Sequence, residues 1–102
     1  MKTAYHATET RNSEQILRGG LEADLPLADQ SLPCGVYLFS VLTDAEDYAA
    51  LNFDEWTILA VNIDGIDLTP DPTYDEGVAW IATGDIDAGR IDSIADQHPV
   101  RF

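Results

Sequence analysis

The sequence predicts an α+β domain in which strands dominate and two helices come early. Short strand patterns recur along the whole chain, two segments with helix signals lie in its first half, and no repeat or linker divides it. The 102 residues are 45% hydrophobic, so the chain can bury a core, and its length leaves no room for a second domain. We therefore expect a single domain over residues 1–102.

The first expected elements are a strand over residues 2–8 and a helix that follows it directly. Asn12, with Gln15 three residues later, resembles a capping box and places the start of the helix at Asn12. Gly19-Gly20 is typical of a helix end, because glycine tolerates the left-handed conformation found there.

The second helix is expected after a loop over residues 21–33 and a strand over residues 36–40. Thr43 begins another capping-box pattern, which predicts a helix over residues 44–52. Both helices therefore precede most of the strands, which favours an α+β arrangement over a parallel βαβ sheet.

The rest of the chain is expected to be mainly strands. Residues 56–63 alternate and are rich in β-forming side chains. Asp64-Gly65 is typical of a tight turn, after which residues 66–68 would return as a short strand. The other expected elements are a loop over 69–75, a strand over 78–82, and a turn within 84–94 that leads into a last strand.

The charge of the chain is strongly negative, with 19 acidic and 5 basic residues and a formal net charge of −14. Such a surface repels phosphate backbones and anionic lipids, so bulk binding to nucleic acid or to a membrane is not expected. Two interpretations remain: adaptation to high salt, and an interaction protein that offers acids to a basic partner. The sole lysine, Lys2, and the scattered acids favour the first.

Cysteine content and hydropathy bear on the compartment. The sequence has no apolar run near ~18 residues and no basic leader followed by an apolar stretch, so neither export nor membrane insertion is expected. A lone cysteine, Cys34, forms no internal disulfide, and His98 has no second ligand at metal-binding spacing. We therefore expect a cytoplasmic protein without a metal site.

His6 is the first candidate for chemistry. Thr8 lies two residues on and shares its face of the strand, so two hydrogen-bonding side chains line one side. A neutral imidazole donates one hydrogen bond, for example to a ribose hydroxyl, while it accepts another. A lone histidine in this position is more often a half-buried structural residue.

Tyr37 and Glu76 are the other candidates. The Tyr37 ring can stack on a planar heterocycle, and Gly35 before it would let a ligand approach the backbone. Glu76 precedes a late strand, where a carboxylate would accept a hydrogen bond from a ribose 2′-hydroxyl and stabilise a cation-like transition state. The alternatives are a core aromatic at Tyr37 and a solvated loop acid at Glu76.

With these residues in place, the chain resembles the ADP-ribosyltransferase superfold, in particular small members related to RNA 2′-phosphotransferases, poly-ADP-ribose-polymerase-like enzymes and DNA-targeting bacterial ADP-ribosyltransferases. The likeness rests on Tyr5-His6-Ala7-Thr8 before a helix that ends in Gly-Leu, and on Gly35-Val36-Tyr37-Leu38 before the second helix. The late run Trp80–Ile86 is similar to a late strand of the family. The resemblance implies a split antiparallel sheet with two early helices.

The resemblance also implies a function, with NAD as substrate. It implies NAD binding by His6, Ala7, Thr8, Gly35 and Tyr37 and catalysis by His6, Tyr37 and Glu76. The implied chemistry is mono-ADP-ribosyl transfer to a protein or nucleic-acid end, or NAD glycohydrolysis. The chain lacks the arginine partner of the first motif that phosphotransferase members use. Two alternatives stay open: a degenerate member that binds a nucleotide or protein without turnover, and an acidic interaction protein.

The charge generates a first testable prediction. If the acidity is an adaptation to salt, the thermal midpoint should rise between low and molar KCl, because salt screens the repulsion among the acids. Thermal unfolding followed by circular dichroism measures this. A midpoint that stays flat or falls would rule out the adaptation to salt.

Overall fold

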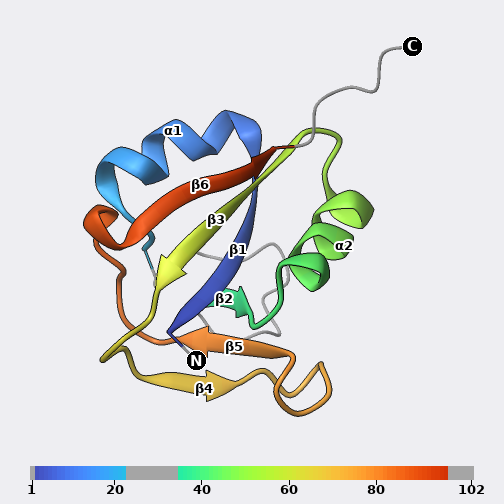
Figure 1. Ribbon diagram of the computed structural model, residues 1–102, viewed down its shortest axis with the longest axis vertical. Helices are drawn as coiled ribbons and strands as arrows, with labels where there is room; N and C mark the ends of the chain where they lie inside the picture. Colours follow the sequence, from blue (N-terminus) through green and yellow to red (C-terminus); the bar gives the residue numbers. More distant parts are fainter. Residues whose placement is uncertain (1, 23–34, 97–102) are drawn as a thin grey trace.

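The computed structural model describes residues 2–22 and 35–96, which form one antiparallel sheet with a helix on each face (Figure 1). In chain order the elements are β1 Thr3–Glu9, α1 Thr10–Gly19, β2 Val36–Phe39, α2 Leu42–Asn52, β3 Trp56–Asn62, β4 Leu68–Pro70, β5 Ala79–Ala82, the 3-10 helix η1 Ala88–Arg90, and β6 Ile91–Asp96. The six strands lie in the order β4-β5-β2-β1-β3-β6, and every neighbouring pair is antiparallel. The predicted α+β class is confirmed.

Three features named above lie outside the described residues: Cys34, His98 and most of the expected loop over 21–33. None of the helices in residues 2–22 and 35–96 has the length and apolar content that crossing a bilayer requires.

Two apolar cores lie on opposite faces of the sheet, and the alternation of β3 builds both. Leu59 of β3 packs on the face that α1 covers, together with Ile16 of that helix. Ile58 packs on the other face, against Ala45 and Ala49 of α2. Burying one large apolar side chain contributes about 1.5–3 kcal/mol, so the central strand stabilises both layers.

The two strands that carry the site candidates pair only briefly. β1 pairs with β3 at seven positions, from Thr3 opposite Asn62 to Glu9 opposite Trp56. It pairs with β2 at one position, Tyr5 opposite Phe39. We call this junction the β1–β2 seam. It joins the half of the sheet made by β1, β3 and β6 to the half made by β2, β5 and β4.

The prediction that Asn12 caps the first helix is wrong. α1 begins at Thr10, directly after the extended residue Glu9, and no side chain caps it. The backbone N–H of Thr10 donates instead to the carbonyl oxygen of Glu55, at 3.2 Å. Because a contact with the loop before β3 satisfies this first free N–H group, the helix starts without a side-chain cap.

The second capping box is also wrong in detail. α2 begins at Leu42, and the N–H groups of Asp44 and Ala45 both donate to the carbonyl oxygen of Val41, at 3.2 and 3.3 Å. Thr43 therefore lies inside the helix. Asp44 stands in the first turn, where a negative charge is favourable beside the positive end of the helix dipole.

The turn at Asp64-Gly65 forms, with Gly65 at φ 77°, but the strand after it does not return beside β3. β4 pairs with β5 at the far edge of the sheet, and β6 takes the place beside β3. The Arg90 guanidinium donates to the carbonyl oxygens of Asn62, at 3.1 Å, and Asp64, at 2.8 Å. This contact joins the turn to the start of β6.

The end of α1 is fixed by Gly20, in agreement with the predicted Gly19-Gly20 stop. Its N–H donates to the carbonyl oxygen of Ile16 at 2.7 Å, and its φ is 87°. The next residue, Leu21, forms a β-bridge with Ile86 through hydrogen bonds of 2.9 and 2.8 Å. A Cβ on Gly20 would lie 2.3 Å from the carbonyl oxygen of Ile86.

The two glycines at this end give a matched test. Gly20→Ala should lower the free energy of unfolding by at least about 1–3 kcal/mol, because it adds backbone strain and a collision with Ile86. Gly19→Ala should be neutral or slightly stabilising, because a Cβ at Gly19 meets no atom within 4 Å. Urea denaturation of both variants measures the difference. Equal stabilities would contradict this account of the helix end.

Candidate functional site

His6 of β1 and Tyr37 of β2 meet across the seam. Nδ1 of the half-buried His6 lies 2.9 Å from the main-chain carbonyl oxygen of Tyr37. Because a carbonyl oxygen only accepts, Nδ1 carries the proton in the neutral ring and Nε2 remains an acceptor. The hydrogen bond therefore sets the tautomer of His6.

Burial decides the charge of this imidazole. It lowers the pKa of His6 below the ordinary value of 6.5, and the hydrogen bond to the Tyr37 carbonyl opposes that shift with a smaller effect. The ring is therefore neutral at pH 7. A neutral imidazole with its acceptor on Nε2 suits a ligand that presents a hydroxyl group.

A pocket of ≈ 540 Å³ lies at this seam, and His6 is among the residues that line it. Cavities of roughly 300–1,000 Å³ are typical of sites for small ligands and cofactors. All five residues predicted to bind NAD line this pocket: His6, Ala7, Thr8, Gly35 and Tyr37. The structure thus brings together residues from two strands, β1 and β2, that are separated in sequence by α1 and residues 20–35.

Part of the lining of the same pocket is aromatic. We call Phe39, Tyr48, Phe53 and Tyr74 the aromatic wall. The Phe39 ring centroid lies 5.5 Å from that of Tyr48 and 5.3 Å from that of Tyr74, and Tyr48 lies 6.1 Å from Phe53. Sequence reasoning missed this wall, since its members come from β2, α2 and two loops and share no spacing along the chain.

Two acids line the pocket, Glu9 and Asp71, and the predicted Glu76 is not one of them. Glu76 is exposed in the loop between β4 and β5 and is not among the residues that line the pocket. Asp71, in the same loop, lines it and is 4% exposed. Asp71 Oδ1 accepts hydrogen bonds from the backbone N–H and the hydroxyl of Thr73, at 2.9 and 2.7 Å. The only sequence signal for Asp71 is the turn pattern Asp-Pro-Thr, which points to local structure.

The loop that carries both acids is attached to the end of β2. The Ser40 hydroxyl donates to the carbonyl oxygen of Gly77 at 2.8 Å and accepts from Trp80 Nε1 at 2.7 Å. The Ser40 N–H donates to the carbonyl oxygen of Val78 at 3.0 Å. Side-chain and main-chain contacts together position this loop beside the pocket.

Gly35 has a structural reason to be glycine. A Cβ there would lie 2.4 Å from Cγ2 of Ile81 and 3.0 Å from the carbonyl oxygen of Ala82. The start of β2 thus packs too closely on β5 for a side chain. The expectation that Gly35 admits a ligand to the backbone stays a prediction.

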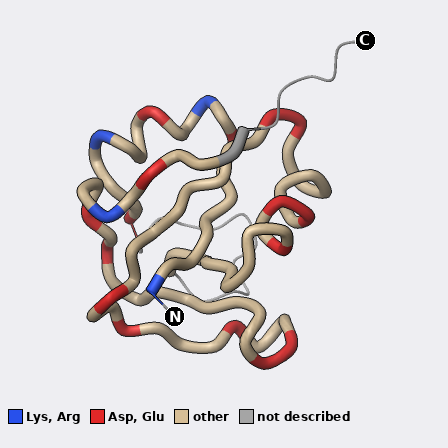
Figure 2. Tube along the Cα trace, in the orientation of Figure 1, with Lys and Arg blue, Asp and Glu red and all other residues tan. Residues whose placement is uncertain are grey.

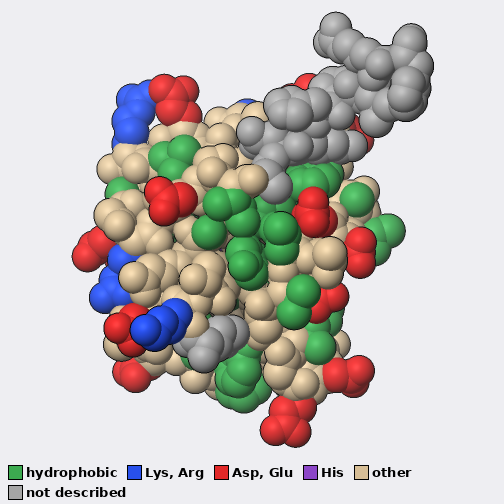
Figure 3. All heavy atoms as spheres, in the orientation of Figure 1, with side chains coloured by type: hydrophobic (Ala, Val, Ile, Leu, Met, Phe, Trp, Pro, Cys, Tyr) green, Lys and Arg blue, Asp and Glu red, His purple; other side chains and the backbone are tan. Residues whose placement is uncertain are grey.

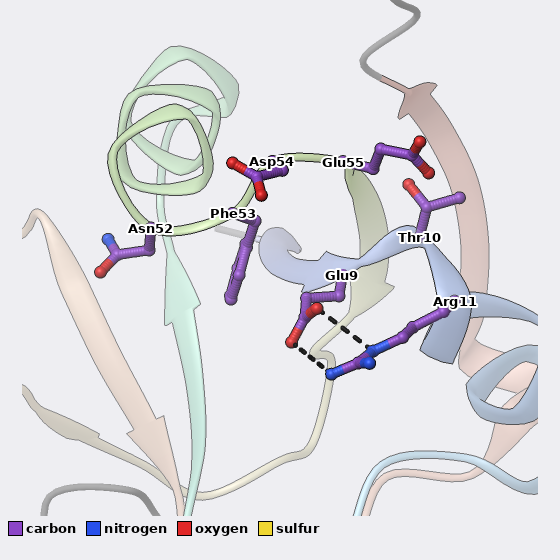
Figure 4. Close-up of a pocket in the computed structure, with 7 residues that line it drawn as sticks. All are labelled: Glu9, Thr10, Arg11, Asn52, Phe53, Asp54 and Glu55. Carbon is purple, nitrogen blue, oxygen red and sulfur yellow. Dashed lines mark hydrogen bonds and ion pairs between the residues drawn. The ribbon is translucent and has the colours of Figure 1, made fainter.

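A second, more polar hollow of ≈ 420 Å³ lies between the start of α1 and the loop before β3 (Figure 4). Figure 4 shows Arg11 turned toward Glu9, with Arg11 Nε 3.2 Å from Glu9 Oε2. This guanidinium is therefore already paired with a carboxylate. The hollow shares Glu9 and Phe53 with the pocket that His6 lines.

No protein-family model matches the sequence, and a comparison with curated proteins finds no significant match. Within residues 2–22 and 35–96, no three His, Cys, Asp or Glu side chains come together as metal ligands.

The state of His6 generates a pH prediction. A folded-state pKa below 6.5 means that the unfolded chain binds the proton more tightly, so the His6 contribution to stability is complete above pH 6.5 and is lost as the pH falls below it. Between about pH 7.5 and about pH 5.5, the wild type should lose stability relative to His6→Gln, which has no titrating group at this position.

Urea denaturation of both proteins across this range measures the difference, and the titration of the many acids cancels between them. Parallel stability curves would show that the pKa of His6 is the same in the folded and unfolded chains.

Proposed function

We propose that the chain binds NAD in the pocket at the β1–β2 seam and cleaves it, either by mono-ADP-ribosyl transfer or by NAD glycohydrolysis. The observation that carries the proposal is the hydrogen bond from His6 Nδ1 to the Tyr37 carbonyl oxygen, at 2.9 Å. The resemblance rests on these two residues, and both line one pocket. The size of the pocket and its mixture of aromatic and polar residues support the same proposal.

The proposed roles follow from the chemistry of the side chains. Nε2 of the neutral His6 accepts a hydrogen bond from a ribose hydroxyl and so orients that sugar. The Tyr37 ring stacks on nicotinamide. The bond between C1′ of the ribose and the nicotinamide nitrogen breaks, its electron pair stays on nicotinamide, and the acceptor or water adds to C1′ and loses a proton.

A carboxylate should stabilise the positive charge that develops on the ribose. The resemblance implies Glu76, which does not line the pocket. Of the two acids that do, Glu9 is paired with Arg11, so the geometry favours Asp71. We therefore propose Asp71 for this role. Because Glu76 lies outside the lining of the pocket, a second candidate function is binding of a nucleotide without turnover.

Three variants test the proposal through nicotinamide release, with NAD binding measured by calorimetry in parallel. Tyr37→Leu keeps apolar volume but removes the ring, so it should weaken NAD binding roughly three- to tenfold. Asp71→Asn should mainly lower turnover, by about 2–4 kcal/mol of transition-state stabilisation, because its charge matters most as the cation forms. Glu76→Gln should change turnover little.

The results separate the alternatives. Full turnover of Asp71→Asn together with a large loss in Glu76→Gln would return the catalytic role to Glu76. Binding of NAD by the wild type without nicotinamide release, with water or with any acceptor tested, would favour the non-catalytic binder. A wild type that does not bind NAD would overturn the proposal.

A further inference from the structure

One face of α2 carries an exposed stripe of apolar and acidic side chains. Asp44, Tyr48 and Leu51 follow one another at spacings of four and three residues, and Asp47 stands beside them, so all four share one side of the helix. Leu51 is 86% exposed and Tyr48 is 37% exposed. We call these four residues the α2 stripe. The core needs neither exposed side chain, since Ala45 and Ala49 face the sheet.

The charge around the stripe has one sign. Residues 35–89 contain twelve acids and no lysine or arginine. Figure 2 shows the basic residues along α1, at the start of β1 and near η1, whereas α2 and the loops around β4 and β5 carry only acids. Figure 3 shows hydrophobic and acidic side chains interspersed over α2. A single exposed leucine is ordinary on a protein surface. Where the charged residues around it are all acidic, a partner that is both apolar and basic is complementary to the surface.

The stripe continues into the aromatic wall through Tyr48. Tyr48 and Tyr74 both contact the Phe39 ring, and both are more than a third exposed. Burial raises the pKa of Tyr74, and the neighbouring Tyr48, Asp71 and Asp44 raise it further. Two carboxylates, Asp44 and Asp71, therefore lie near two partly exposed aromatic rings. A lysine or arginine side chain is attracted by both features.

We propose that the α2 stripe and the rim formed by Tyr48 and Tyr74 bind a basic, amphipathic segment of a partner protein. Apolar side chains of that segment cover Leu51, and its cationic side chains lie against the tyrosine rings and beside Asp44 and Asp47. The rim is shared with the pocket, since Tyr48 and Tyr74 line both. Asp44, Asp47 and Leu51 do not line the pocket, so binding of the segment needs no NAD.

Other occupants fit this surface poorly. Nucleic acid and anionic lipid are repelled by the acids. In a second copy of the chain, Arg11 is paired with Glu9 and Arg18 with Glu14, and Arg90 donates to two carbonyl oxygens of its own chain. Among the cations of the described residues, that leaves Lys2, a single charge against the two acids of the stripe. A segment with free cations and apolar side chains satisfies both parts of the stripe.

Fluorescence anisotropy with a labelled peptide tests the proposal, without NAD. The peptide carries Leu at spacings of three and four residues, so that a helix presents them on one face, and Arg at the positions beside that face. A matched peptide with Gln in place of every Arg is the second probe. The wild type should bind the Arg peptide, more weakly as salt is added, and should not bind the Gln peptide measurably. Leu51→Ser should weaken binding by about tenfold. Tyr48→Leu should weaken it by about three- to tenfold, since it keeps apolar area but removes the ring.

Matched controls separate this site from general attraction to an acidic protein. Leu17→Ser on α1 and Asp92→Asn on β6 alter similar residues on other elements, and both should bind as the wild type does. Asp47→Asn should weaken binding more than Asp92→Asn. Equal losses in the stripe variants and the controls, binding of the Gln peptide, or no binding of the Arg peptide at low salt would each overturn the proposal. Circular dichroism of every variant checks that it is folded.

Discussion

The hydrogen bond from His6 to the Tyr37 carbonyl is the interaction on which the candidate site depends. β1 and β2 pair at a single position, so little else in the main chain sets their separation. A side chain from one strand therefore supplies the link that regular pairing supplies elsewhere in the sheet. The same bond uses the proton of Nδ1, and burial holds the ring neutral. Geometry, tautomer and charge are thus coupled in one residue.

The pocket lies on the face of the sheet that α2 covers. The two cores lie on opposite faces, and each includes residues from both sides of the seam. Ala7, Phe39 and Ala79 belong to the core on the α2 face and also line the pocket. Side chains of that core and hydrogen-bonding residues such as His6 and Thr8 therefore line one concave site, a mixture typical of small-ligand pockets.

Local patterns predicted the elements well, and tertiary contacts account for what they missed. The α+β class, both helices and the strand over 56–63 were foreseen, because hydrophobic period and glycine stops are local signals. The caps at Asn12 and Thr43 failed, since a loop carbonyl and the Val41 carbonyl satisfy the helix starts instead. The hairpin after Gly65 failed because β6 occupies the edge of β3.

The site shows the same division. The strand positions of His6 and Tyr37 were enough to predict a shared cleft, whereas Asp71 and the aromatic wall come from segments that only the folded chain brings together. The order of residues in the sequence predicts Glu76 as the carboxylate of the site. The order of residues predicts which loop carries an acid. It does not predict which acid of that loop lines the pocket, which here is Asp71.

The contacts of Leu21 and Gly35 have a consequence for how this fold can vary. Leu21 bridges to Ile86, and a Cβ on Gly35 would collide with Ile81, so both residues depend on one short stretch of β5 and the turn after it. A backbone shift in that stretch would disturb the end of α1 and the start of β2 together. The positions from Ile81 to Ile86 therefore constrain two elements that are distant in the sequence, and few substitutions there can act on one element alone.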